Sequence, residues 1–222
     1  MNTAPSVASL ASSAAGHLAN YCDSAGGYAW PAYDIDDRVG HLVPTDVLAP
    51  AFLSYPMKGT YLNEMFRHDV PANPYAVLRS SLETAATNAE LRHLTFEALG
   101  VDDLQDRSGH GWGLVLECID AVQECKGLTS VAVTKILHRK LPDLVPVNDS
   151  RIRAFYKVTD GYATLFERLH ADLNANLGLI DEWRMPHRLP DDRPMSRLRA
   201  LDIVIWMHMA NSAVENDEPE EL

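Results

Sequence analysis

Along most of this chain, apolar residues recur at the spacing of amphipathic helices, and they do not alternate as they would in strands. The apolar residues between Leu78 and Leu99 predict helices across roughly 75–99, closed by Gly100 as a C-cap. Similar faces cover residues 115–122 and 165–177. The pattern predicts an all-α, multi-helix globular fold, with about eight to ten helices joined by proline-containing loops.

The two ends of the chain differ from its middle. Residues 1–22 are rich in Ala and Ser, which predicts a weakly ordered arm or a weak helix. Residues 23–214 predict one helical domain, either a single body or two lobes. The last helix of that domain, expected at 195–214, is apolar nearly all round and should be buried, whereas 180–194 is expected to be a loop. Residues 215–222 include five acids and predict a disordered tail.

Composition and cysteine usage narrow the class of protein. Hydrophobic residues make up 46% and charged residues 23% of the 222 positions, which is ordinary for a soluble globular protein. No apolar run approaches the ~20 residues that span a bilayer, so no membrane association is expected. The N-terminus lacks the basic and apolar regions of a secretory signal, which predicts a cytoplasmic location. The three cysteines show no metal-binding spacing, and neither a metal nor another cofactor is expected.

Charge is unevenly distributed along the chain. The net charge is −12 at pH 7, which disfavours a general nucleic-acid coat protein because phosphate contacts require lysine and arginine. Residues 126–157 are the exception, since they hold seven lysines and arginines against two aspartates. This basic island predicts an anion-binding surface. A solvated helix face that pairs with acids elsewhere in the chain explains it about equally well.

A helix–hairpin–helix is predicted at residues 114–157, a range that includes the basic island. One helix ends near Lys126, Gly127 allows a left-handed or closely approached backbone, and the next helix is capped by Thr129 or Ser130. The amides of such a turn point outward at a helix N-terminus, where anions are favoured. This geometry is suited to holding a DNA phosphate without reading the base sequence.

These residues resemble a known enzyme family. Gly127-Leu128-Thr129, followed at residues 146–152 by PVNDSRI, resembles the helix–hairpin–helix base-excision DNA glycosylases, in which a Gly-hydrophobic-Gly hairpin precedes an Asp at a helix start. The resemblance implies a DNA-glycosylase-like fold with Asp149 as the catalytic residue. It also places Gly127 and Thr129 at the positions of the two hairpin glycines. The nucleic-acid-binding residues predicted from the resemblance and from charge are Lys126, Gly127, Thr129, Ser130, Lys135, Arg139, Lys140 and Arg151.

The chain departs from that family in several respects. Val131 stands where bifunctional members carry a Schiff-base lysine, so β-lyase activity is not expected. Thr129 replaces the second glycine and narrows access to a phosphate, and the cysteine cluster of the iron–sulfur members is absent. Asp149 also has an ordinary alternative role, because an Asp before an apolar helix is a typical N-cap. The whole chain further resembles a bacterial domain family of unknown function, which implies no chemistry.

The leading hypothesis is a helix–hairpin–helix protein related to DNA glycosylases that binds DNA or a nucleotide. If it is an enzyme, it is expected to be a monofunctional N-glycosidase in which Asp149 stabilises charge on the sugar or orients water. The alternative is a non-catalytic binding or scaffold protein that keeps the fold, and the acidic balance of the chain is compatible with a protein partner. Hydrolysis of a free nucleoside or nucleotide is a third hypothesis.

Overall fold

The computed structural model describes residues 5–22, 30–35, 41–67, 73–108 and 110–217. In these ranges the chain forms eleven α-helices and several 3₁₀ turns, and its only extended pairing is an isolated bridge between Arg188 and Pro194. The all-α prediction is therefore confirmed. No helix among the described residues is long and apolar enough to cross a membrane. The chain divides into two compact units: unit 1 is Met1–Gly27 with Asp149–Leu222, and unit 2 is Tyr28–Asn148.

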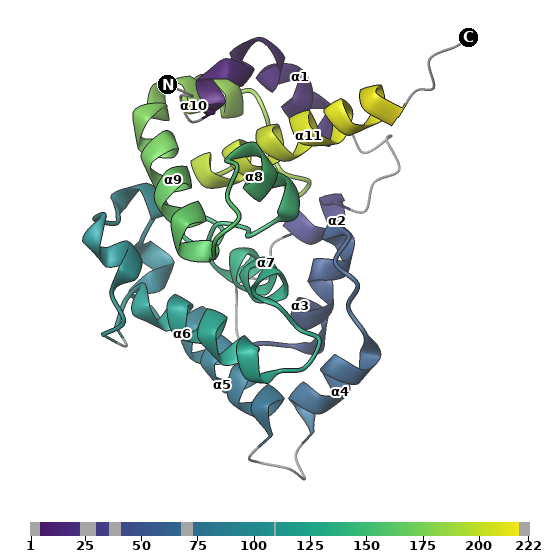
Figure 1. Ribbon diagram of the computed structural model, residues 1–222, viewed down its shortest axis with the longest axis vertical. Coiled ribbons are helices and arrows are strands. Elements are labelled where there is room, and N and C mark those ends of the chain that lie inside the picture. Colours follow the sequence, from purple (N-terminus) through teal and green to yellow (C-terminus); the bar gives the residue numbers. More distant parts are fainter. Residues whose placement is uncertain (1–4, 23–29, 36–40, 68–72, 109, 218–222) are drawn as a thin grey trace. The chain divides into compact units, whose positions relative to one another are not determined.

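Unit 1 is built around its last helix. Its elements are η1 (Val7–Leu10), α1 (Ala11–Cys22), α8 (Ser150–Phe155), α9 (Tyr162–Ala175), α10 (Leu177–Arg184) and α11 (Arg197–Asp217). The other four α-helices all pack against α11 (Figure 1). Residues 200–205 of α11 are buried without a break. The expectation of a buried last helix is confirmed, because an all-round apolar helix is stable only when neighbours cover every face.

The start of the chain is fixed to unit 1 through the buried carboxylate of Asp172. This carboxylate accepts hydrogen bonds from the Ser6 hydroxyl at 2.5 Å, the Val7 amide at 2.9 Å and the Tyr156 hydroxyl at 2.8 Å. Burial and the neighbouring carboxylate raise the pKa of Tyr156 well above its usual value, so the phenol remains a proton donor. The described part of residues 1–22 is accordingly a packed helix and not a loose arm.

Helix α10 is an element that the sequence pattern did not predict. Residues 180–194 were expected to form a loop, but the first five of them belong to α10. The Asp181 carboxylate binds the Arg197 guanidinium of α11 at 2.9 Å from Nε and 2.6 Å from Nη2. Hydrogen bonds from Arg197 and Arg184 lower the pKa of Asp181 to about 2. A short helix is marginal by itself, and here its stability depends on partners distant in sequence.

Residues 215–217 continue α11, and the rest of the tail predicted to be disordered lies outside the described residues. Residues 23–214 were predicted as one helical body or two lobes, and within this range Tyr28–Asn148 forms a compact unit of its own. The residues that complete unit 1 come from both sides of that insertion.

Unit 2 places α7 in its interior. Its elements are α2 (Trp30–Asp34), α3 (Pro44–Leu48), η3 (Ala49–Leu53), α4 (Gly59–Phe66), α5 (Pro74–Thr87), η4 (Leu91–His93), η5 (Phe96–Ala98), η6 (Asp102–Gln105), α6 (Gly113–Ala121), η7 (Val122–Glu124) and α7 (Ser130–Lys140). Helix α5 packs against both α4 and α6 (Figure 1). Eight of the eleven residues of α7 are buried. The buried residues of α7 include polar and charged side chains as well as apolar ones.

The helices predicted across roughly 75–99 are one α-helix and two 3₁₀ turns in the structure. Helix α5 ends at Thr87, and Asn88 then adopts an extended conformation with its side chain accepting the Leu91 amide at 3.1 Å. Two 3₁₀ turns, η4 and η5, follow. An asparagine side chain that bonds the local backbone competes with helix continuation, which accounts for the break.

Candidate nucleic-acid interface

The turn between η7 and α7, at the position of the predicted hairpin, is short. Gly127 has φ of +89°, a left-handed conformation that favours glycine, and the Leu128 amide bonds the Cys125 carbonyl at 3.1 Å. The Leu128 side chain is buried beneath the turn. Thr129 is the N-cap residue of α7 through its extended backbone, but its hydroxyl makes no capping bond. Two helical segments therefore meet at a short turn that keeps Lys126, Gly127 and Thr129 exposed.

Three tyrosines from the preceding segments of unit 2 contact this turn. The Tyr75 hydroxyl donates to the Lys126 carbonyl at 2.7 Å, and the Tyr55 hydroxyl lies 3.3 Å from the Thr129 hydroxyl. The Tyr61 hydroxyl lies so close to Gly127 that a β-carbon at this position would be 2.5 Å from it. Glycine is therefore required at position 127 for two reasons: the backbone is left-handed there, and a side chain would collide with the Tyr61 hydroxyl.

Three of the predicted phosphate-binding cations lie inside unit 2. The Lys135 ammonium donates to the Leu53 carbonyl at the end of η3, at 2.8 Å. The Arg139 guanidinium donates to the Tyr33 carbonyl of α2 at 2.6 Å. The Lys140 ammonium lies 2.7 Å from the carboxylate of Asp46, which is fully buried.

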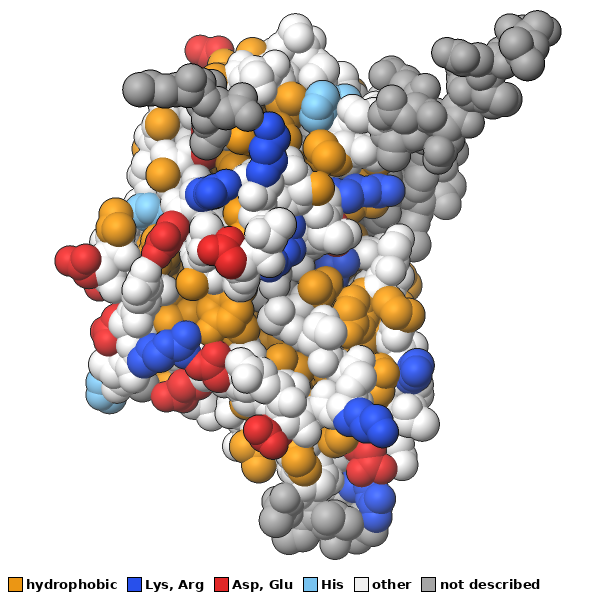
Figure 2. Space-filling view, in the orientation of Figure 1, with side chains coloured by type: hydrophobic (Ala, Val, Ile, Leu, Met, Phe, Trp, Pro, Cys, Tyr) orange, Lys and Arg blue, Asp and Glu red, His pale blue; other side chains and the backbone are white. Residues whose placement is uncertain are grey.

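These contacts change the meaning of the basic island. Arg139 also pairs with Asp46, at 3.3 Å, so one buried carboxylate of α3 holds two cations of α7. The cationic side chains of α7 thus bind backbone carbonyls and a carboxylate within unit 2, and they do not form a basic surface. Among the described residues on the face drawn in Figure 2, lysine and arginine side chains are scattered between acids instead of forming one stripe. The predicted cation that remains at the hairpin surface is Lys126.

Asp149 opens α8 in unit 1, as its alternative role predicted. The side chain is 8% exposed, and its carboxylate accepts the Arg151 amide at 3.0 Å, which is an N-cap bond. The Arg151 side chain turns to the Trp206 ring of α11, with the guanidinium carbon 4.0 Å from the ring centre. Arg151 therefore takes part in packing within unit 1 through a cation–π contact. The Ser130 hydroxyl accepts a bond at 2.9 Å from the Asn148 amide group in unit 2.

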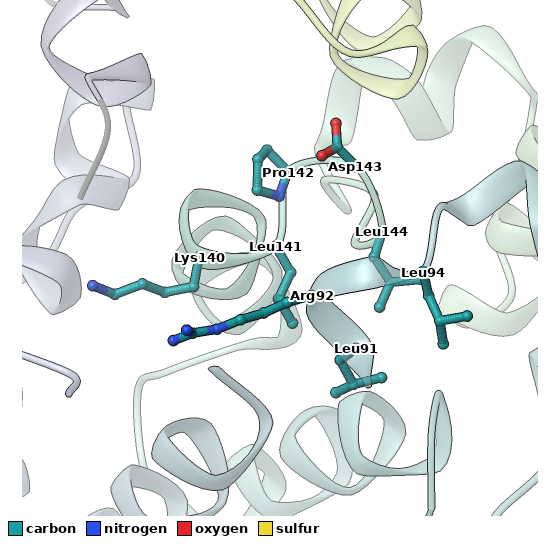
Figure 3. Close-up of a pocket in the computed structure, with 8 residues that line it drawn as sticks. All are labelled: Leu91, Arg92, Leu94, Lys140, Leu141, Pro142, Asp143 and Leu144. Atoms are coloured by element: carbon teal, nitrogen blue, oxygen red, sulfur yellow. The ribbon is translucent and has the colours of Figure 1, made fainter. Parts of the chain in front are cut away.

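A small pocket lies in unit 2 at the end of α7 (Figure 3). Its volume is about 220 Å³, and leucine side chains with Pro142 form much of its wall. The Arg92 and Lys140 side chains extend to the same side of it in Figure 3. The Lys140 ammonium binds Asp46, and Arg92 Nε donates to the Ala86 carbonyl at 3.1 Å. The pocket is smaller than the ~300 Å³ typical of sites that enclose organic ligands, and we assign it no ligand.

Other reactive groups offer little chemistry. Within the described ranges, no three His, Cys, Asp or Glu side chains gather in a way that could hold a metal ion. Burial raises the pKa of Cys118 to about 12 and that of Cys125 to about 11, so both thiols stay protonated at neutral pH. His138 is buried, with Nδ1 2.7 Å from the Val145 carbonyl oxygen. The candidate groups that remain are the hairpin and Asp149.

The tyrosine contacts to the hairpin were not predicted as a group. Tyr61 was recognisable as part of a short helical face, but Tyr55 and Tyr75 lie in different segments and share no motif with it. Their common feature is a hydroxyl that reaches residues 126–129, some fifty or more positions later in the chain. Only the folded arrangement of α4, α5 and the turn brings them together.

Comparison with known proteins identifies a family but gives no activity for it. The DUF6308 model, which describes a family of unknown function, matches residues 14–209. No curated protein matches the chain, and no solved structure does.

Proposed function

We propose that this chain, which belongs to the DUF6308 family of unknown function, binds a phosphate of DNA or of a nucleotide at the turn of residues 125–130. The observation that carries the proposal is the exposed turn at the start of α7, in which Gly127 adopts a φ of +89° just before the first amides of the helix. The first amides of a helix have no helical acceptor, and the helix dipole adds positive charge there. Lys126 adds a full charge beside them.

As an enzyme, the chain would be a monofunctional N-glycosidase with Asp149 as the catalytic carboxylate. As the bond from sugar to base breaks, its electron pair leaves with the base and the sugar becomes positively charged. An ionised carboxylate stabilises that charge, and a water molecule then adds to the sugar carbon and gives up its proton, which neutralises the departed base. Val131 supplies no amine for a Schiff base, so the reaction would stop at an abasic site.

A non-catalytic binding protein is the second candidate. The bond from the Arg151 amide and the 8% exposure of Asp149 support it, because both are expected of a carboxylate that only caps a helix. The inward bonds of Lys135 and Lys140 support it as well, since they leave few cations for a long duplex. In this case the hairpin would bind a phosphate or a protein partner without chemistry.

Binding is tested with a fluorescent 20-base-pair duplex, titrated with the protein at low salt and followed by anisotropy. The Lys126→Ala variant should weaken binding and reduce the salt slope by about one, because one phosphate contact is lost. Arg188→Ala, an exposed cation of unit 1, is the matched control and should bind as the parent protein does. Equal affinity of the parent and Lys126→Ala would place the phosphate elsewhere.

Catalysis is tested by incubating the protein with duplexes that each carry one damaged base and by scoring abasic sites. Asp149→Asn is the informative variant, because asparagine caps a helix as well as aspartate does but carries no charge. Abasic sites formed by the parent and lost in Asp149→Asn, at unchanged thermal stability, would support the N-glycosidase. Activity that survives in Asp149→Asn would reject this mechanism, and inactivity of both proteins on every duplex would favour the non-catalytic protein.

A further inference from the structure

The surface beside the hairpin is aromatic. Tyr61 and Tyr75 stack on each other, with ring centres 6.4 Å apart and an angle of 16° between the rings. Tyr61 is buried, whereas Tyr75 and Tyr55 both keep part of their surface open to solvent. The hydroxyls of Tyr75 and Tyr55 are oriented by Lys126 and Thr129, so the turn itself holds these rings in place.

Two lysines flank these rings. Lys58 lies over the Tyr61 ring, with Nζ 5.9 Å from its centre, and Lys126 belongs to the turn. Both side chains are exposed, and neither ammonium pairs with a carboxylate in the described part of the chain. Two acids are also near: Glu64, which pairs with Arg67 at 3.4 Å, and Glu124 beside the turn. The surface therefore combines fixed rings with a small local charge.

We propose that the tyrosine–lysine surface, defined as Tyr55, Lys58, Tyr75 and Lys126, binds an unpaired segment of nucleic acid. The bases stack on the partly exposed rings of Tyr55 and Tyr75, and the two lysines contact the flanking phosphates. This inference rests on the proposed phosphate binding by the hairpin and names the form of nucleic acid that the hairpin takes. Unpaired strands are favoured because bases inside a duplex have no free face for an aromatic side chain, and stacking tolerates any sequence.

The two lysines and the two rings predict the salt dependence of binding and the loss of affinity when a ring is removed. Two phosphate contacts on a single strand give a slope of about −1.4 for the logarithm of affinity against the logarithm of salt concentration. Loss of one stacked base lowers affinity by a factor of about 5 to 150. Binding to this surface should therefore depend strongly on the rings and only weakly on salt, unlike binding of duplex DNA by a basic groove.

The experiment uses the full chain and a fluorescein-labelled oligothymidylate, with a duplex of equal length as the comparison probe. Tyr55→Ala and Tyr75→Ala remove the rings, and Tyr55→Phe and Tyr75→Phe are matched controls that keep them. The expected result is tighter binding of the single strand than of the duplex, with at least about a fivefold loss in each alanine variant. The phenylalanine variants should retain most of the affinity. Thermal unfolding of each variant checks that unit 2 remains folded.

The possible failures are distinguishable. Duplex binding that depends on Lys126 but is unchanged by both tyrosine-to-alanine substitutions would overturn this inference and leave the proposed function standing. Absence of binding to either probe at low salt would overturn this inference and the proposed binding of DNA, and binding of a free nucleotide would then be the part of the proposed function that stands. If an alanine variant unfolds, the matching phenylalanine variant decides: retained single-strand binding with a salt slope near −1.4 supports the surface, and a slope of several units overturns it.

Discussion

The hydroxyl of Tyr61 lies against Gly127, at a distance that would leave only 2.5 Å to a β-carbon on residue 127. Gly127→Ala should therefore destabilise unit 2 through two effects, the left-handed φ of +89° and the collision with Tyr61. The backbone effect alone is about 1–2 kcal/mol in the free energy of unfolding. Urea unfolding of the single variant measures the total.

A double-mutant cycle separates the two effects. Tyr61→Phe removes the hydroxyl, so Gly127→Ala should cost less in that background than in the parent protein, while the backbone part persists. An identical cost in both backgrounds would show that the hydroxyl moves aside freely and that only the backbone matters.

The buried carboxylate of Asp46 holds Arg139 and Lys140 together. Asp46→Asn keeps the size of the side chain but leaves two buried cations without their anion. We expect a loss of about 3–5 kcal/mol in the free energy of unfolding. Asp120→Asn, which breaks the exposed pair with Arg107, is the control and should cost at most about 1 kcal/mol. Similar values for the two variants in urea unfolding would contradict the assignment of α7 cations to the interior.

Asp172 joins the start of the chain to α9. Asp172→Ala removes the acceptor of Ser6, Val7 and Tyr156, so residues of η1 and α1 should exchange their amide hydrogens faster. The expected loss in local stability is at least about 1.5–3 kcal/mol, the range for one hydrogen bond to a charged group. Tyr156→Phe removes a single bond and should show a smaller change at the same amides. Unaltered exchange in Asp172→Ala would mean that apolar packing alone holds α1.

His17 on α1 should make unit 1 sensitive to acid. Burial, and to a lesser extent His208, lowers the pKa of His17 below 6.5, and the two ring centres are 6.2 Å apart. The unfolded chain then binds a proton at this site more readily than the folded chain. The contribution of His17 to stability is therefore intact above pH 6.5 and is lost as the pH falls from there towards the lower folded pKa.

The measurement is the free energy of unfolding at several pH values between about 7.5 and 5. His17→Gln should flatten the fall in stability on the acid side, because glutamine does not titrate. His41→Gln replaces an exposed histidine that pairs with Glu83 and should leave the fall attributed to His17 in place. Curves of equal slope for His17→Gln and the parent would rule out His17 as the source.

Local chemistry predicted a large part of the fold. The apolar sequence of α11 and the helix-opening position of Asp149 follow from residues close together in the chain, and both predictions hold. The role of Lys135 and Lys140 could not be read in the same way, because their partners Leu53 and Asp46 lie far earlier in the sequence. A run of cations looks the same whether it faces solvent or bonds carbonyls and a carboxylate inside the protein. The positions of the partner groups decide which of the two cases applies, and the packing of distant elements sets those positions.

Helix α10 illustrates the same limit in unit 1. It is a short helix of residues Leu177–Arg184, and it is held by the pairs of Asp181 with Arg184 and with Arg197, the first residue of α11. For the hairpin, the left-handed glycine was predictable from the sequence, whereas the tyrosine hydroxyls on it were not. Short-range signals thus locate the turn, and long-range contacts determine which of its groups remain open.

The insertion of Tyr28–Asn148 into unit 1 has a consequence for biosynthesis. A ribosome delivers the whole of unit 2 before any residue of α8 to α11 exists, so unit 2 can fold while translation continues. Helix α1 is made before unit 2, but its partners α10 and α11 are made only after unit 2 is complete. The apolar face of α1, with Leu18 and Tyr21, therefore stays uncovered by these helices until the end of unit 1 is made, and we expect it to be a binding site for chaperones during synthesis.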